Sequence, residues 1–125
     1  MEAKNVCSGG DALVFACSGA ADVGAVADQA AREMTRQGHG KMFCLAGVGG
    51  GIEPILKKTA AAQKILAIDG CPLNCVQGCL EKNGIDKFVH LQLADLGLEK
   101  GKSPATDENI AKAARAGIEK LSASN

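Results

Sequence analysis

Apolar positions along the chain fall into short runs that alternate with segments of helical periodicity. Continuous apolar runs cover residues 12–16, 42–46 and 65–68, and each is too short for a helix and typical of a strand buried on both faces. Residues 88–93 alternate between apolar and polar side chains, as in a half-buried strand. The pattern therefore predicts four strands.

A helical segment follows each predicted strand. The predicted helices cover, approximately, residues 23–37, 53–61, 72–82 and 107–121. Asp22, Cys71 and Thr106 stand directly before three of these helices and are the predicted N-cap residues. Pro72 would then occupy the first position of the third helix, where proline is well tolerated.

Strict alternation of strand and helix is typical of the α/β class. We expect a small three-layer domain with a mostly parallel four-stranded sheet and helices on both faces. No linker, repeat or low-complexity block interrupts the pattern, and 125 residues suit a single core. Residues 1–125 are therefore predicted to form one domain, with residues 1–10 as a loose N-terminal arm.

Charge and aromatic content exclude several classes of partner. The chain has 14 basic and 14 acidic residues, so no excess of positive charge indicates a nucleic-acid partner. It contains three Phe and no Trp or Tyr, which leaves few aromatic platforms for stacking bases. No segment approaches the roughly 18 apolar residues that a membrane helix needs. We expect neither a nucleic-acid nor a membrane partner, and a protein partner stays undetermined.

Six cysteines stand out against this background. The first residues, Met1 to Lys4, are followed by no apolar run long enough for a secretory signal, so we expect a cytoplasmic protein. Thiols stay reduced in that compartment, where clustered cysteines more often serve metal or redox chemistry than disulfides.

Four of the cysteines are predicted to meet at one edge of the sheet. Cys17, Cys44 and Cys71 lie at the carboxyl ends of the first three predicted strands, where sites form in α/β proteins. Cys75 lies one helical turn after Cys71 and would share its helix face. Four thiolates are a common ligand set for tetrahedral Zn²⁺, so we predict a zinc site at this edge. Iron–sulfur clusters use the same ligands and remain an alternative.

The other two cysteines are harder to assign. Cys79 continues the spacing of Cys71 and Cys75, and it is either a further ligand or a core residue. Cys7 has no predicted role. With a strand order of 2-1-3-4, the ends of strands two and three would lie about 9.6 Å apart, so the following loops would have to curl inward to share an ion.

A redox function is the second hypothesis. Cys71 at a helix N-terminus would have a depressed thiol pKa, and Cys75 could act as the resolving thiol of a disulfide exchange reaction. Asp69 is either a turn residue or a partner of the site, while His39 and His90 are expected to be structural or solvated. We find no catalytic motif, so no enzymatic reaction is assigned.

The run from Ile68 to Cys75, IDGCPLNC, resembles the DGC-domain family, whose members are thought to chelate zinc through cysteines. Supporting matches are ACSG at residues 16–19, MFCLAG at 42–47 and DLG at 95–97, in the order typical of that family. The resemblance implies a metal-binding domain with no established reaction. It carries the ligand role to the four cysteines named above: Cys17, Cys44, Cys71 and Cys75.

Overall fold

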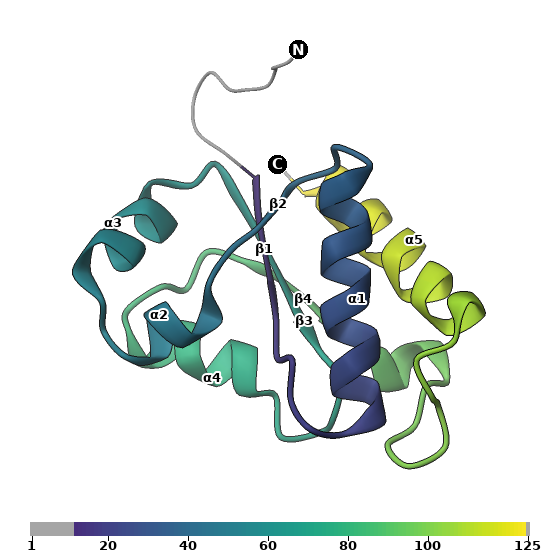
Figure 1. The fold of residues 1–125 in the computed structure, drawn as a ribbon. Helices are drawn as coiled ribbons and strands as arrows, with labels where there is room; N and C mark the ends of the chain where they lie inside the picture. Colours follow the sequence, from purple (N-terminus) through teal and green to yellow (C-terminus); the bar gives the residue numbers. More distant parts are fainter. Residues whose placement is uncertain (1–11, 125) are drawn as a thin grey trace.

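A four-stranded parallel sheet forms the centre of the molecule (Figure 1), in a computed structural model that describes residues 12–124. The strand order is β2-β1-β3-β4, and every neighbouring pair is parallel. The strands are β1 (Ala12–Ala16), β2 (Lys41–Met42), β3 (Lys64–Asp69) and β4 (Val89–Gln92). The predicted α/β fold is confirmed, with all four strands parallel.

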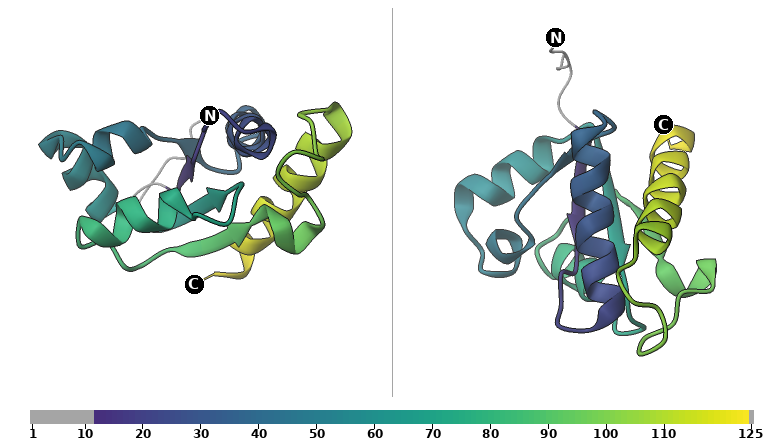
Figure 2. Two further views of the ribbon diagram at one scale, coloured as in Figure 1. Left: turned by 90° about the horizontal axis from the view of Figure 1, so that it is seen from below. Right: turned by 45° about the vertical axis from the view of Figure 1, so that its right-hand side comes forward.

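Helices cover both faces of the sheet, and in Figure 2 α1 and α5 run side by side on one of them. The opposite face carries α2, α3 and α4 (Figure 1). The helices are α1 (Asp22–Arg36), α2 (Leu45–Gly49), α3 (Glu53–Ala61), α4 (Cys75–Lys82) and α5 (Asp107–Ala123), and a short 3₁₀ helix, η1, covers Leu93–Leu96.

Alternation along each strand divides the core into two halves. Val14 and Ala16 of β1 pack under α1 and α5, while Leu13 and Phe15 point to the other face. On that second face, Val48, Val76 and Leu80 are fully buried, and the ring of Phe15 meets Phe43 edge to face with centroids 6.0 Å apart. The sheet is thus buried on both sides, which explains the continuous apolar runs in its strands.

The predicted second strand is wrong after its first residue. β2 ends at Met42. One further hydrogen bond to β1 follows, from the backbone N–H of Phe43 to the backbone oxygen of Val14 at 2.9 Å. The chain then turns into α2, with Cys44 as its N-cap residue. The helix forms there because it buries Val48 in the second half of the core.

The third predicted helix also begins later than expected, at Cys75 instead of Pro72. Asn74 has a left-handed backbone (φ 55°), which separates the turn at residues 71–73 from the helix. Cys71 is therefore not the N-cap, and Cys71 and Cys75 do not share a helix face. Asp22 is likewise the first residue of α1, and Ala21 is its N-cap.

Other predicted elements are confirmed within a residue or two. Thr106 is the N-cap of α5, and its hydroxyl accepts the backbone N–H of Asn109 at 3.1 Å. Within the described part of the chain, no helix is long and apolar enough to cross a membrane. Cys7 and the predicted N-terminal arm lie outside the described residues.

Candidate metal centre

The carboxyl ends of β1 and β3 lie next to each other, because Ala16 is paired with Ile68 in the sheet. Cys17 follows β1 directly, and its backbone N–H donates to the oxygen of Ile68 at 3.2 Å. Its Sγ accepts a hydrogen bond from the backbone N–H of Gly70 at 3.4 Å. Cys17 therefore lies beside the Asp-Gly-Cys run, which contains the predicted ligand Cys71.

Gly70 sits where no side chain fits. A Cβ atom at this position would lie 2.5 Å from the backbone oxygen of Val23, in the first turn of α1. Main-chain atoms of α1 cannot move aside as the end of a flexible side chain can. The missing side chain thus brings the turn after β3 against the start of α1 and within reach of Cys17.

Asp69, the last residue of β3, anchors the start of α4. Its carboxylate is 1% exposed and accepts the backbone N–H groups of Val76 at 2.8 Å and Gln77 at 3.2 Å. Nε2 of His90, on β4, lies 2.8 Å from the same carboxylate. A buried carboxylate requires such partners, and here they fix the position of α4 relative to the sheet.

Gln92, at the end of β4, holds the turn that carries Cys71. Its Nε2 donates to the backbone oxygen of Cys71 at 3.0 Å and to Oδ1 of Asn74 at 2.6 Å. Its Oε1 accepts the backbone N–H of Ala94 at 3.1 Å. Sequence reasoning missed this residue, although a polar side chain at the carboxyl end of a predicted strand was a signal for it.

Cys75, the first residue of α4, lies among several groups that can carry negative charge. Desolvation by neighbouring atoms raises the pKa of its thiol, and repulsion from Cys71, Asp69, Cys17 and Cys79 raises it further. A raised pKa means that the thiolate is disfavoured unless a cation is close. In the redox hypothesis Cys75 is the resolving thiol, so its raised pKa disfavours the thiolate of that residue.

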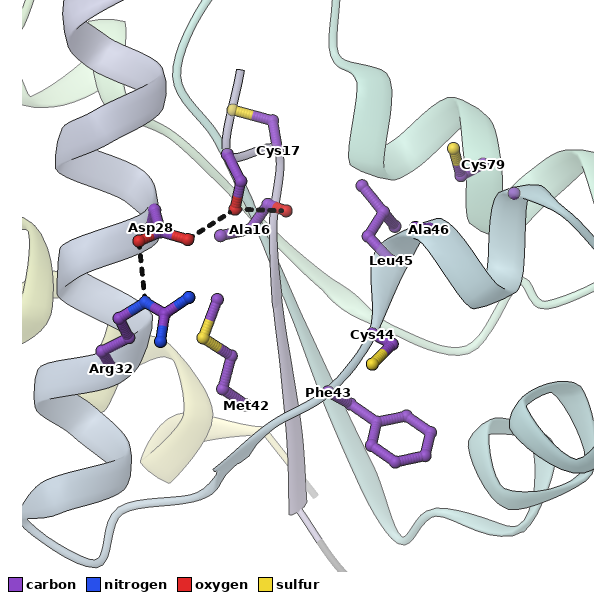
Figure 3. Close-up of a pocket in the computed structure, with 12 residues that line it drawn as sticks. Ala16, Cys17, Asp28, Arg32, Met42, Phe43, Cys44, Leu45, Ala46 and Cys79 are labelled. Atoms are coloured by element: carbon purple, nitrogen blue, oxygen red, sulfur yellow. Dashed lines mark hydrogen bonds and ion pairs between the residues drawn. The ribbon is translucent and has the colours of Figure 1, made fainter. Parts of the chain in front are cut away.

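A cavity of about 700 Å³ lies between the end of β1, α1 and α2, and three cysteines line it. Figure 3 shows that Cys17, Cys44 and Cys79 reach it from three different segments. Their sulfur atoms do not point toward one common position (Figure 3). Cys71 and Cys75 are not among the lining residues, so the cysteines form two overlapping groups: one around the cavity and one around Cys75, which includes Cys71, Cys17 and Cys79.

Cys79 belongs to both groups, since it lines the cavity and also repels the Cys75 thiolate. All five cysteines within residues 12–124 are free thiols, which is the donor chemistry that Zn²⁺ and other soft cations accept. In the same residues, no group of three or more Cys, His, Asp or Glu side chains is placed to hold a metal ion. The donor set thus fits zinc in kind, while the ligand assignment remains a prediction.

The family model of the DGC domain matches residues 13–116, which is most of the chain. This chain belongs to the DGC domain family. A curated relative of this DGC domain is the "Anaerobic and virulence modulator AnvM" of Pseudomonas aeruginosa, which is 41% identical over 88 residues, covering 70% of this chain and 67% of the relative. No solved structure gives a significant match.

Each residue of the Asp-Gly-Cys run has its own place in this DGC domain. Asp69 binds the start of α4, Gly70 allows close contact with α1, and Cys71 is half-buried against the core under α1 and α5. The run therefore joins β3 to helices on both faces of the sheet.

Proposed function

We propose that this DGC domain binds Zn²⁺ through cysteine thiolates at the carboxyl edge of the sheet. The observation that carries the proposal is the position of Cys75, where desolvation and the nearby Cys71, Asp69, Cys17 and Cys79 disfavour the thiolate and raise the pKa of the thiol. A divalent cation bound among these groups would offset this repulsion and stabilise the Cys75 thiolate.

Cys17, Cys71 and Cys75 are the ligands that both the sequence and this electrostatic grouping favour. The fourth thiolate comes from Cys44, as the sequence predicts, or from Cys79, which lies in both groups of cysteines. Bound zinc would supply a fixed tetrahedral link between the loops after β1 and β3. We place this site in the cytoplasm, since it requires reduced thiols.

The redox alternative has less support than zinc binding, because it placed Cys71 at the start of a helix and α4 begins at Cys75. An iron–sulfur cluster would use the same thiolates, and metal analysis distinguishes it from zinc by detecting iron. The relative AnvM is named as a modulator, and its name gives neither a reaction nor a metal. We therefore propose a binding function and no catalytic step.

The test is metal analysis of protein purified under reducing conditions without added metal. We expect about one equivalent of zinc per chain, lost in C75A while the circular dichroism spectrum stays native, because Cys75 is exposed. C7S serves as a control for the loss of one thiol. Less than about a tenth of an equivalent of any metal, unchanged after reconstitution, would overturn the proposal.

Comparison of C44S with C79S identifies the fourth ligand. The variant that lacks it should bind zinc with much lower affinity, whereas the other should match the unmodified protein. Mutation of a residue that only hydrogen-bonds a metal ligand commonly lowers metal affinity about 10–100-fold. Loss of a direct ligand should lower the zinc affinity by at least about this factor.

A further inference from the structure

We propose that the cavity lined by Cys17, Cys44 and Cys79 also binds a small organic carboxylate, held by the guanidinium of Arg32. This inference goes beyond metal binding and does not depend on it. It rests on the shape and chemistry of the cavity wall formed by α1 and the ends of β1 and β2.

The cavity has the size and lining of a small-molecule site. Its volume of about 700 Å³ lies within the usual range of about 300–1,000 Å³ for such sites. Carbon-rich residues make up much of the wall, including Met42, Phe43 and Leu45. Few charged or hydroxyl side chains interrupt them: Arg32 and Ser18 lie on the α1 side, where both bind Asp28, which also lines the cavity. A ligand with an apolar body and one polar end fits this lining.

Arg32 is held in place by a short chain of hydrogen bonds. Its Nε donates to Oδ2 of Asp28 at 2.8 Å, and the hydroxyl of Ser18 donates to Oδ1 of the same carboxylate at 2.8 Å. Burial acts to raise the pKa of Asp28, but the hydrogen bonds from Arg32 and Ser18 outweigh it and lower the pKa. Asp28 is therefore charged at neutral pH and holds Nε of the guanidinium.

The outer part of the guanidinium is available to a ligand. Within the described residues, the hydrogen bonds of Arg32 involve Nε alone, which leaves the N–H donors of both Nη atoms. The Arg32 side chain is 55% exposed, and Arg32 lines the cavity together with Met42 (Figure 3). Two parallel N–H donors in one plane match the two oxygens of a carboxylate.

The charge of Asp28 selects a carboxylate over a phosphate monoester. Asp28 lies next to Arg32 and repels any anion that binds to the same guanidinium. A carboxylate carries one negative charge, whereas a phosphate monoester carries nearly two at neutral pH and suffers more repulsion. The apolar wall then takes the carbon chain of the ligand.

The first test compares hexanoate with its neutral analogue hexanamide, by ¹H–¹⁵N NMR titration of reduced, metal-free protein. We expect saturable shifts at the amides of Cys17, Arg32 and Cys44, with hexanamide at least about tenfold weaker because it lacks the charge. Equal affinity for the two probes would overturn the role of Arg32. Tighter binding of hexyl phosphate than of hexanoate would overturn the choice of a carboxylate.

The second test uses R32Q with R36Q as the matched control. Arg36 lies one turn further along α1 and pairs with Glu33, so its replacement removes a similar surface ion pair outside the cavity. We expect R32Q to weaken hexanoate binding at least about tenfold and R36Q to leave it unchanged. Equal effects of both variants, or of neither, would contradict the proposal. Because these titrations use metal-free protein, their failure would not bear on zinc binding.

Discussion

At Gly70 a single missing side chain lets the turn after β3 lie against the first turn of α1. A methyl group there would lie 2.5 Å from the oxygen of Val23. We predict that G70A is destabilised by about 1–3 kcal/mol or more, because the crowding atoms belong to a main chain that cannot rotate away. Urea unfolding measures the free energy difference.

The control for this variant is the same substitution at Gly78. Gly78 is exposed within α4, and a Cβ atom there meets nothing within 4 Å. Alanine favours the helix over glycine by about 0.8–1 kcal/mol, so G78A should be as stable as the unmodified protein or more stable. A G70A protein as stable as G78A would show that the close contact with α1 is not rigid.

Asp22 joins the start of α1 to the loop after η1. Its hydrogen bonds lead us to expect a specific pH dependence of folding stability. Its carboxylate accepts the backbone N–H groups of Gly101 at 2.9 Å and Ser103 at 3.0 Å. The Gly101 bond is the main cause that lowers the pKa of Asp22; burial opposes it, and the Ser103 bond adds to the lowering. A lowered folded-state pKa stabilises the protein above the ordinary carboxyl pKa, and this contribution is lost as pH falls through the lowered value.

We therefore expect D22N to be less stable than the unmodified protein at pH 7, with a smaller difference near pH 3, because the unfolded-state carboxyl of Asp22 is then largely protonated and the contribution of its lowered folded-state pKa is being lost. Urea unfolding at the two pH values gives the comparison. D86N, at an exposed position in the loop before β4, controls for the loss of one negative charge. A stability difference for D22N that does not change with pH would contradict this interpretation.

At the scale of elements, β4 positions the Asp-Gly-Cys turn through His90 and Gln92. In Q92E the amide donor becomes a carboxylate oxygen that faces two acceptors, the backbone oxygen of Cys71 and Oδ1 of Asn74. We predict a loss of about 1–3 kcal/mol in unfolding free energy and faster hydrogen exchange at the amide of Asn74. Q63E makes the same chemical change at an exposed site near the opposite end of β3, and should alter neither quantity. Equal hydrogen exchange rates at Asn74 in the two variants would contradict the claim that Gln92 positions the Asp-Gly-Cys turn.

The elements show which parts of the fold the sequence could predict. β1 and β3 were predictable because apolar runs bounded by polar residues suit strands buried on both faces. The run at residues 42–46 has the same composition, but Val48 and its neighbours pack as a helix against α3 and α4, and periodicity cannot separate a short buried strand from a short buried helix.

The start of α4 was unpredictable for another reason. Its N-terminal N–H groups are bound by Asp69, which is six residues before the helix and belongs to β3. N-cap preferences concern only the residues next to a helix, and on that basis Cys71 was the predicted N-cap. The long-range contact and the left-handed Asn74 together move the helix start to Cys75.

For the whole molecule, parallel topology was sufficient to place cysteines at one edge of the sheet. The order β2-β1-β3-β4 puts the ends of β1 and β3 side by side. This arrangement allows the backbone N–H of Gly70 to donate a hydrogen bond to Sγ of Cys17. The sequence could not show that Cys79 would reach the same cavity as Cys44, because that depends on how α4 packs against α2. The place of Arg32 in that cavity depended on tertiary packing in the same way.

X-ray absorption at the zinc edge of the purified protein tests the central claim most directly, because it identifies the atoms bound to the metal. Zinc held by cysteines should show a sulfur shell at about 2.3 Å that corresponds to about four thiolates. A shell of only nitrogen or oxygen atoms at about 2.0–2.2 Å would contradict ligation by the cysteines at the carboxyl edge of the sheet.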